Sequence, residues 1–176
     1  GKLTVRVGAD AHAGIVWLRL IDAEGASTPR PFVIANLPSV RETEPNDSPK
    51  QAQQLASSSV VHGKFDKNGA PDAFAIQVAA GQTLGAQLQS NEILGSPADG
   101  ALQICSADGQ VLAANQDAGS LDSLVTYRPT TAGTYLVRGF ALPTTPNSSI
   151  NFAGGELFIY RLTITTGPYA DYALPM

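Results

Sequence analysis

The feature that most constrains this chain is an alternation of apolar and polar residues that recurs along its length. It is clearest at residues 158–165, where Phe158, Tyr160, Leu162 and Ile164 alternate with largely polar neighbours. Successive side chains of a strand point to opposite faces, so this pattern predicts a half-buried strand of an antiparallel sheet. The other runs predicted to be strands are residues 3–7, 14–22, 31–36, 60–65, 72–78, 83–90, 101–106, 111–114, 124–128 and 134–140.

Turn-forming residues separate these runs. Pairs such as Asn68-Gly69 lie between predicted strands, and the 176 residues include 17 Gly and 12 Pro but only 15% charged residues. This composition favours turns over helices, and the spacing is typical of a sandwich or barrel. Residues 48–55 are the exception, because Ser48 as a cap and Pro49 at a first helical position predict at most one turn of helix. We therefore expect an all-β, antiparallel β-sandwich.

Charge and hydropathy exclude two classes of partner. The formal net charge of −4 and the pI near 5.0 give no attraction for nucleic-acid phosphates. No apolar run reaches the ~18 residues that a membrane span needs, so we expect no membrane insertion. The single Cys105 lies in an apolar run and is interpreted as a buried, inert thiol.

A polar, proline-punctuated stretch at residues 37–47 predicts a boundary between two parts, 1–40 and 41–176. The first part holds only three predicted strands, too few for a full core of its own. Its Gly25-Ala26-Ser27 turn and its later Phe-Val-Ile strand resemble the end of an immunoglobulin-like IPT/TIG domain. The resemblance implies that residues 1–40 are the last strands of such a domain plus a linker, which would add extra N-terminal strands to the sandwich.

The densest cluster of carboxylates follows this boundary. Residues 42–48 read E-T-E-P-N-D-S, with three carboxylates and one amide in six positions. The residue before Pro45 avoids the helical region, so the segment is held extended and alternate oxygen-bearing side chains point the same way. Clustered oxygen ligands suit a hard cation such as Ca²⁺. A solvated acidic linker is the alternative interpretation.

Several further segments follow this motif in a fixed order. They are residues 51–55, V-H-G-K-F at 61–65, P-D-A-F-A-I at 71–76, A-A-G-Q-T-L at 79–84, S-A-D-G at 106–109, A-N-Q-D at 114–117 and T-A-G-T-Y-L-V at 131–137. Together with the opening E-x-E-P-N-D they resemble the bacterial pre-peptidase C-terminal (PPC) domain family over about residues 42–165. The resemblance implies a jelly-roll-like β-sandwich that accompanies the catalytic part of a secreted protein.

The resemblance also implies a calcium site. Carried over position by position, its ligands are Glu42, Glu44, Asn46, Asp47 and Asp72. One departure weakens the match, because this chain has Gly69 where collagenase relatives have an Asp three residues before Asp72. Asn68 or Asp66 could replace that carboxylate.

Catalytic candidates are few. The two histidines are His12, in a predicted loop, and His62, in a predicted strand, and neither lies in a protease or zinc-site signature. We interpret both as structural or surface residues. We interpret the polar cluster of Asp117, Asp122 and Ser123 as ordinary polar residues of a loop rather than as a glycosidase acid–base pair.

We therefore expect a non-catalytic accessory module, secreted, periplasmic or displayed at the cell surface. It would be stabilised by Ca²⁺ and would bind an extracellular protein, a polysaccharide or neighbouring domains of its own chain. A purely structural spacer in a large exported protein is the alternative, and a hydrolase is a distant third.

Overall fold

The computed structural model describes residues 4–66, 69–118, 120–143, 145 and 151–168. The chain divides into two compact units, Gly1–Leu37 and Pro38–Met176. The division precedes the predicted boundary after residue 40, because β5 (Ser39–Arg41) pairs with a strand of the second unit. The assignment of the first unit to an immunoglobulin-like domain stays a prediction.

The first unit consists of two small antiparallel pairs. β1 (Gly14–Leu18) pairs with β4 (Arg30–Ile34), and β2 (Ile21–Asp22) pairs with β3 (Gly25–Ala26). The predicted strand at residues 3–7 is wrong over residues 4–7, where the chain has no partner strand to supply ladder hydrogen bonds. None of the described residues of this unit is buried.

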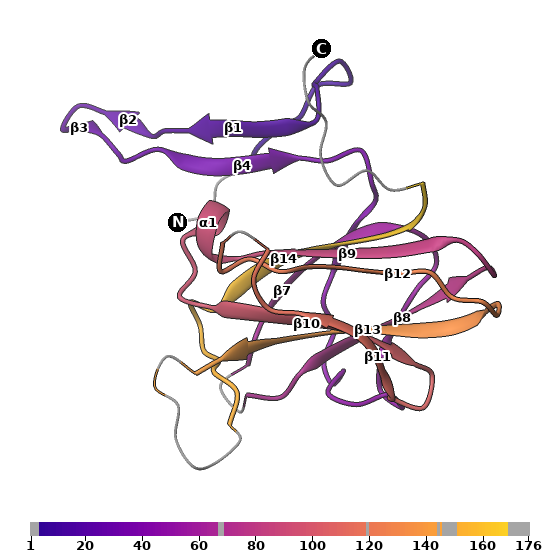
Figure 1. The fold of residues 1–176 in the computed structure, drawn as a ribbon. Coiled ribbons are helices and arrows are strands. Elements are labelled where there is room, and N and C mark those ends of the chain that lie inside the picture. Colours follow the sequence, from indigo (N-terminus) through magenta and orange to yellow (C-terminus); the bar gives the residue numbers. More distant parts are fainter. Residues whose placement is uncertain (1–3, 67–68, 119, 144, 146–150, 169–176) are drawn as a thin grey trace. The chain divides into compact units, whose positions relative to one another are not determined.

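The second unit is a β-sandwich, as predicted, whose two layers Figure 1 shows edge-on. The strands of one sheet are β6 (Gln53–Leu55), β8 (Asp72–Val78), β10 (Asp99–Ser106), β11 (Val111–Asn115) and β13 (Gly133–Leu142). The strands of the other are β5, β7 (Ser59–Lys64), β9 (Thr83–Gln89), β12 (Leu124–Tyr127) and β14 (Ile159–Gly167). Their spatial orders are β11-β10-β13-β8-β6 and β12-β9-β14-β7-β5. The jelly-roll-like connectivity stays a prediction.

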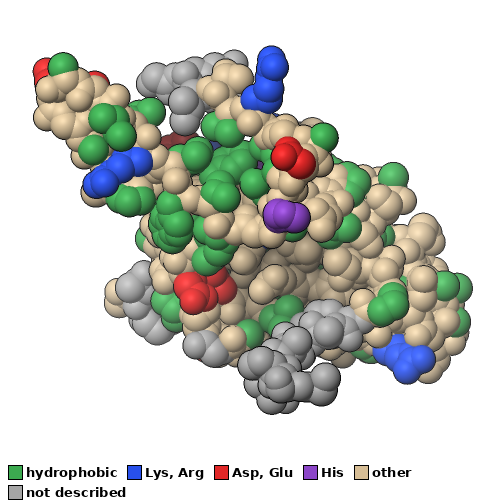
Figure 2. All heavy atoms as spheres, turned by 90° about the horizontal axis from the view of Figure 1, so that it is seen from above, with side chains coloured by type: hydrophobic (Ala, Val, Ile, Leu, Met, Phe, Trp, Pro, Cys, Tyr) green, Lys and Arg blue, Asp and Glu red, His purple; other side chains and the backbone are tan. Residues whose placement is uncertain are grey.

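The core lies between these sheets and follows the predicted alternation. In β14 the alternate residues Tyr160, Leu162 and Ile164 are buried in it. Burial of each large apolar side chain contributes about 1.5–3 kcal/mol. The largest fully buried side chains are Phe65, Phe74, Leu84, Leu88, Leu102, Ile104, Leu136, Leu162 and Ile164. On the surface in Figure 2, charged side chains are few, in keeping with the low charged fraction of the sequence.

Two expectations fail where the chain enters the sandwich. Residues 53–55 form strand β6 rather than the end of a helical turn, and only a hydrogen bond from the Gln51 N–H to the Ser48 carbonyl marks a turn before it. The sheets are also not wholly antiparallel, because β5 pairs with β7 and β6 pairs with β8 in parallel. From β5 to β8 successive strands alternate between the two sheets, so each of these pairs joins strands separated by a crossover.

The one helix in the described part of the chain is α1 (Asn91–Leu94), directly after β9. Its first N–H groups are bound by a carboxylate distant in sequence. Asp122 Oδ1 accepts from the N–H groups of Ser90 at 2.9 Å and Asn91 at 2.8 Å, and Oδ2 accepts from the N–H of Glu92 at 3.3 Å. The N-cap residue Ser90 makes no side-chain capping bond, so Asp122 is what satisfies these N–H donors of the helix.

Candidate metal centre

The chain between β5 and β6 crosses from the edge of one sheet to the edge of the other, and the E-x-E-P-N-D motif occupies this crossing. Backbone hydrogen bonds hold it at both ends. The Glu42 N–H donates to the His62 carbonyl at 3.0 Å, and the Asn46 carbonyl accepts from the Ala73 N–H at 3.0 Å. The peptide bond before Pro45 is cis. The motif is therefore fixed to both sheets rather than free in solvent as an acidic linker would be.

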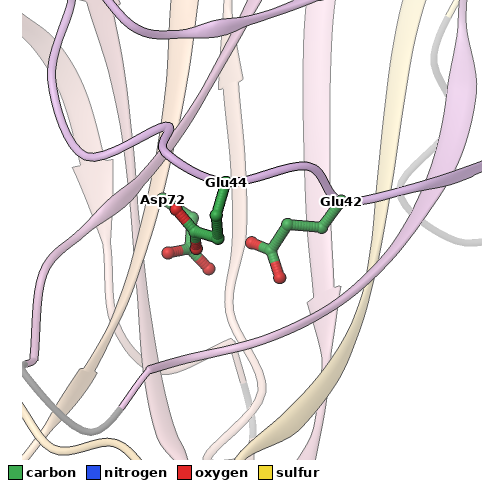
Figure 3. Close-up of side chains that lie close together, drawn as sticks. All are labelled: Glu42, Glu44 and Asp72. Carbon is green, nitrogen blue, oxygen red and sulfur yellow. The ribbon is translucent and has the colours of Figure 1, made fainter.

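Three carboxylates meet at this crossing (Figure 3). Glu42 and Glu44 come from the crossing segment, and Asp72 is the first residue of β8. One oxygen of each lies within 4.8 Å of the others. Two unit charges at such a separation repel by about 3–4 kcal/mol at an effective dielectric constant of ~20. Asp72 is 1% exposed, whereas Glu42 is half-buried and Glu44 is exposed, so the cluster opens to solvent beside Glu44.

Two buried polar atoms in this cluster have no hydrogen-bond partner. Asn46 is 0% exposed and its Nδ2 donates to Glu42 Oε1 at 3.3 Å, yet its Oδ1 accepts no hydrogen bond. The Oδ2 atom of Asp72 is also without a partner. A buried acceptor left unsatisfied costs about 1–3 kcal/mol. Both atoms are oxygens next to the carboxylates of Glu42 and Glu44, which is where a bound cation would satisfy them.

Tyr160 of strand β14 helps to hold Glu42 in place, a contact that no pattern in the sequence predicts. The Tyr160 hydroxyl donates to Glu42 Oε1 at 2.5 Å, and the Lys64 N–H donates to Oε2 at 2.8 Å. Tyr160 lies opposite Gly63 in the ladder between β14 and β7. A Cβ atom at Gly63 would overlap the Tyr160 hydroxyl and lie 2.6 Å from Glu42 Oε2. Glycine at this position is therefore what lets the tyrosine reach the carboxylate.

The electrostatics of the cluster favour a proton or a cation over three free charges. Burial, followed by the hydrogen bond and charge of Glu42, raises the pKa of Asp72 from 3.8 to about 10. Desolvation also raises the pKa of Glu44; the N–H of Asn46 opposes this shift, and the charge of Glu42 adds to it. Burial raises the pKa of the Tyr160 phenol well above 10, so its hydroxyl stays a donor to Glu42.

The donor set fits a hard cation. Three carboxylates and an amide oxygen are all oxygen ligands, with no imidazole or thiolate among the grouped residues, and such sets suit Ca²⁺ better than zinc or copper. Glu42 already accepts three hydrogen bonds, so Glu44, Asp72 and Asn46 retain more free lone pairs. Solvent at the Glu44 side could supply further oxygen ligands.

The structure does not bring every predicted ligand into this group. Asp47 is exposed and its carboxylate lies outside the three-carboxylate cluster. Gly69 has a φ of 62°, and a Cβ there would overlap the Phe152 carbonyl, so no aspartate fits at this position. Asp66 forms an ion pair with Lys64 at 3.4 Å. Asn68 lies outside the described residues.

The other candidates from the sequence have structural surroundings. Cys105 is buried, as predicted, and desolvation raises the pKa of its thiol. Asp122 is committed to the N–H groups that begin α1. His62 presents its side chain on the outer face of β7, between the buried Val61 and the Tyr160-facing Gly63. In the part of the chain that the structure describes, no helix combines the length and the apolar character of a membrane span.

No family model matches this chain. The chain is 28% identical over 139 residues to a probable subtilase-type serine protease of Deinococcus radiodurans, a match that covers 78% of this chain. The matched part amounts to 18% of that protein, so this chain corresponds to a small portion of its curated relative.

Two solved structures are similar to it in fold. One is a periplasmic inhibitor of g-type lysozyme from Aeromonas hydrophila, with a TM-score of 0.44 and 11% identity over 73% of this chain and 96% of that one. The other is the pre-peptidase C-terminal domain of a collagenase from Bacillus anthracis, with a TM-score of 0.42 and 9% identity over 71% and 99%.

Proposed function

We propose that this chain is a non-catalytic accessory module of a larger secreted, periplasmic or surface-displayed bacterial protein, and that Ca²⁺ stabilises its sandwich. The ligands are Glu42, Glu44, Asn46 and Asp72. Asp47 is left out of this set because its carboxylate is exposed and is not among the three carboxylates grouped at the site.

The observation that carries the calcium site is the pair of unsatisfied buried oxygens. An acidic cluster alone could be a solvated surface, but Asn46 Oδ1 and Asp72 Oδ2 are shielded from water and have no donor. A cation would satisfy both and would offset the repulsion among the three carboxylates.

The ion would link the two sheets through its ligands. Glu42 and Glu44 belong to the crossing that leaves β5, whereas Asp72 begins β8 in the opposite sheet. An ion bound by all three would prevent the two sheet edges from separating. Such an ion-mediated link suits a module outside the cell, where calcium is abundant enough for sites with a Kd of ~0.1–1 mM.

Two observations support the accessory role. The matched protease is much longer than this chain, which supports a module carried by a larger protein. Two of the candidates for catalysis have structural surroundings instead, because Asp122 binds the start of α1 and Cys105 of β10 is buried among Ala52, Ala73, Ala75 and Leu136. The module would bind an extracellular protein or polysaccharide, or neighbouring domains of its own chain.

Calorimetric titration with calcium and thermal melting test the site. Wild-type protein should gain about 0.5–1.5 kcal/mol of stability at millimolar calcium, and much less with magnesium, which demands a tighter octahedral geometry. Glu44→Gln and Asp72→Asn should abolish both the heat of binding and the melting shift. Glu92→Gln, which removes an exposed carboxylate in α1, is the matched control and should behave as wild type. A wild-type protein without a binding heat or a melting shift would refute the site.

A substrate screen tests the accessory role separately. The purified chain should not turn over peptide, ester or glycoside substrates. Turnover that disappears in His62→Ala or Asp117→Ala would show that the chain is an enzyme.

A further inference from the structure

The N-terminal unit, residues 1–37, differs in charge from the sandwich. Of the 11 basic and 15 acidic residues of the chain, four basic and three acidic ones belong to this unit, which leaves the sandwich with seven and twelve. Charges farther apart than about 8 Å are largely screened at physiological ionic strength. The potential at a site in this unit therefore depends on the charged side chains around that site more than on the chain's net charge of −4.

A groove of about 620 Å³ lies within this unit and gathers three of its arginines. Arg6, Arg19 and Arg30 line the groove, and no aspartate or glutamate is among the described residues that line it. All three arginines are exposed, and the ion pairs in the described part of the chain involve none of them. Arg19 Nε donates to the Ser27 carbonyl at 2.6 Å, which positions this guanidinium. The groove is therefore positively charged without an internal counter-charge.

The same groove has an apolar wall. Val5 is 39% exposed and Leu20 is 64% exposed, and the half-buried Leu18 lies with them in the lining. A ligand that covers such side chains gains about 25 cal/mol for each Å² of apolar surface removed from water. Arginines beside aliphatic side chains suit an anion that also carries apolar groups.

One side of the groove has unpaired backbone. Residues 4–6 line it, and they belong to the segment that lacks a partner strand. Their backbone N–H and C=O groups form no hydrogen bond with another described residue. A peptide in an extended conformation can pair with such a segment, because main-chain hydrogen bonds supply affinity and alternate side chains supply specificity. The groove thus offers three kinds of contact that one peptide strand could make together.

We propose that this groove binds an extended acidic segment of a partner protein. Carboxylates of the segment contact the three arginines, each of which can bind a carboxylate through two parallel hydrogen bonds. An aliphatic side chain of the segment packs against the apolar wall. The inference rests on the proposed function as a protein-binding module, and it adds the chemistry of the partner and the surface that binds it.

Other occupants suit this groove less well. A two-fold contact with a second copy would bring the arginines of two grooves together, and like charges repel. An anionic membrane would be repelled by Asp22 and Glu24, which lie at the β2–β3 turn next to the 78% exposed Ile21. A phosphate or uronate polymer has no aliphatic side chains to cover the apolar wall.

Fluorescence anisotropy with the full chain tests this site. The probe is a short labelled peptide in which glutamate alternates with valine, and the comparison peptide carries glutamine in place of glutamate. The glutamate peptide should bind at least tenfold more tightly than the glutamine peptide, and its affinity should fall as ionic strength rises. Arg6→Gln and Arg30→Gln should each weaken binding about tenfold, the effect expected for one lost hydrogen bond to a charged group. Arg41→Gln, which removes an exposed arginine outside the groove, is the matched control and should bind as wild type.

The backbone contact has its own test. A glutamate–valine peptide that is N-methylated at alternate residues keeps its charges but loses main-chain donors, so it should bind at least tenfold more weakly. Circular dichroism of each variant would show that the sandwich remains folded, as expected because the three arginines are exposed.

Several results would overturn the proposal. They are equal binding of the glutamate and glutamine peptides, an affinity that neither Arg6→Gln nor Arg30→Gln changes, and self-association of the chain that competes with the peptide in sedimentation. Binding of phosphatidylserine vesicles or of polyglucuronate without binding of the peptide would also overturn it. Peptide binding should persist in a calcium chelator. A chain that binds calcium, turns over no substrate and ignores the peptide would refute this inference and leave the calcium site standing.

Discussion

The Tyr160 hydroxyl donates a 2.5 Å hydrogen bond to Glu42 Oε1 across 118 positions of the chain. It connects the core of β14 to the crossing segment between the sheets, and the absence of a side chain at Gly63 makes room for it. The carboxylate is thus oriented before any ion arrives. Such preorganisation reduces the entropic cost of binding at the site.

Tyr160→Phe should therefore weaken calcium binding as well as the fold. The loss of a hydrogen bond to a charged group should lower the free energy of unfolding by about 1.5–3 kcal/mol. The loss of orientation should reduce calcium affinity about tenfold or more. Tyr135→Phe is the matched control, because the Tyr135 hydroxyl donates to the Thr131 carbonyl far from Glu42. It should lower stability and leave calcium affinity intact; an unchanged affinity in Tyr160→Phe would show that the hydroxyl does not orient Glu42.

Gly63→Ala should disturb the same contact by crowding it. The added methyl would overlap the Tyr160 hydroxyl and approach Glu42 Oε2, so the ring or the crossing must move. Overpacking of this kind costs about 1–3 kcal/mol, measurable by urea unfolding. Gly133→Ala is the control, because a Cβ at Gly133 of β13 meets no atom within 4 Å. Equal stability of the two variants would mean that Gly63 is not needed for the tyrosine contact.

The strands could be predicted because their alternation is local, and Tyr160 was correctly placed in a buried face. The role of the Tyr160 hydroxyl could not be predicted, because this role depends on which strand lies beside β14 and on the register that sets Gly63 opposite Tyr160. The same limit explains β6, whose three residues become a strand only through pairing with β8. Glu42, Glu44 and Asp72 came from a resemblance between motifs rather than from a local pattern of the strands.

Asp122→Ala should loosen α1 without affecting calcium. Its carboxylate accepts from three backbone N–H groups at the start of the helix and from the Ser90 hydroxyl at 3.1 Å. Removal of these bonds should cost about 2–4 kcal/mol, since two buried and two partly buried donors lose their acceptor together. Hydrogen exchange should accelerate at Asn91 and Glu92. Calcium affinity should not change, and a large loss of affinity would show that the two regions are coupled.

Deletion of residues 1–37 should leave the sandwich folded, because none of the described residues of that unit is buried. Deletion of residues 1–41 should be more harmful, since it removes β5 and its parallel pairing with β7. Near-UV circular dichroism should show native signals for the first truncation, and the second should melt at a lower temperature. A molten first truncation would mean that the N-terminal unit is required for folding.

Calcium affinity should rise with pH because the ion competes with a proton on Asp72. The folded pKa of this carboxyl, about 10, lies above its ordinary value of 3.8, so the folded protein retains a proton that an unfolded chain releases. Without calcium, this residue's contribution to stability is therefore greatest below about pH 4 and is lost progressively as the pH rises toward 10. At the proposed site calcium would displace the proton, so its binding should strengthen over the same range.

Calorimetry in two buffers with different ionisation enthalpies would detect the released proton directly. Asp72→Asn supplies the reference, because it keeps the side-chain size and removes the titrating group. Measured in chelator, the unfolding free energy of the wild type should fall relative to that of Asp72→Asn as the pH rises from 5 to 8. Both of these pH values lie between the ordinary pKa of Asp72 and its pKa in the folded protein. A difference that is constant with pH would mean that Asp72 is already ionised in the folded protein, and that the unpaired Oδ2 is satisfied by something other than a proton or a cation.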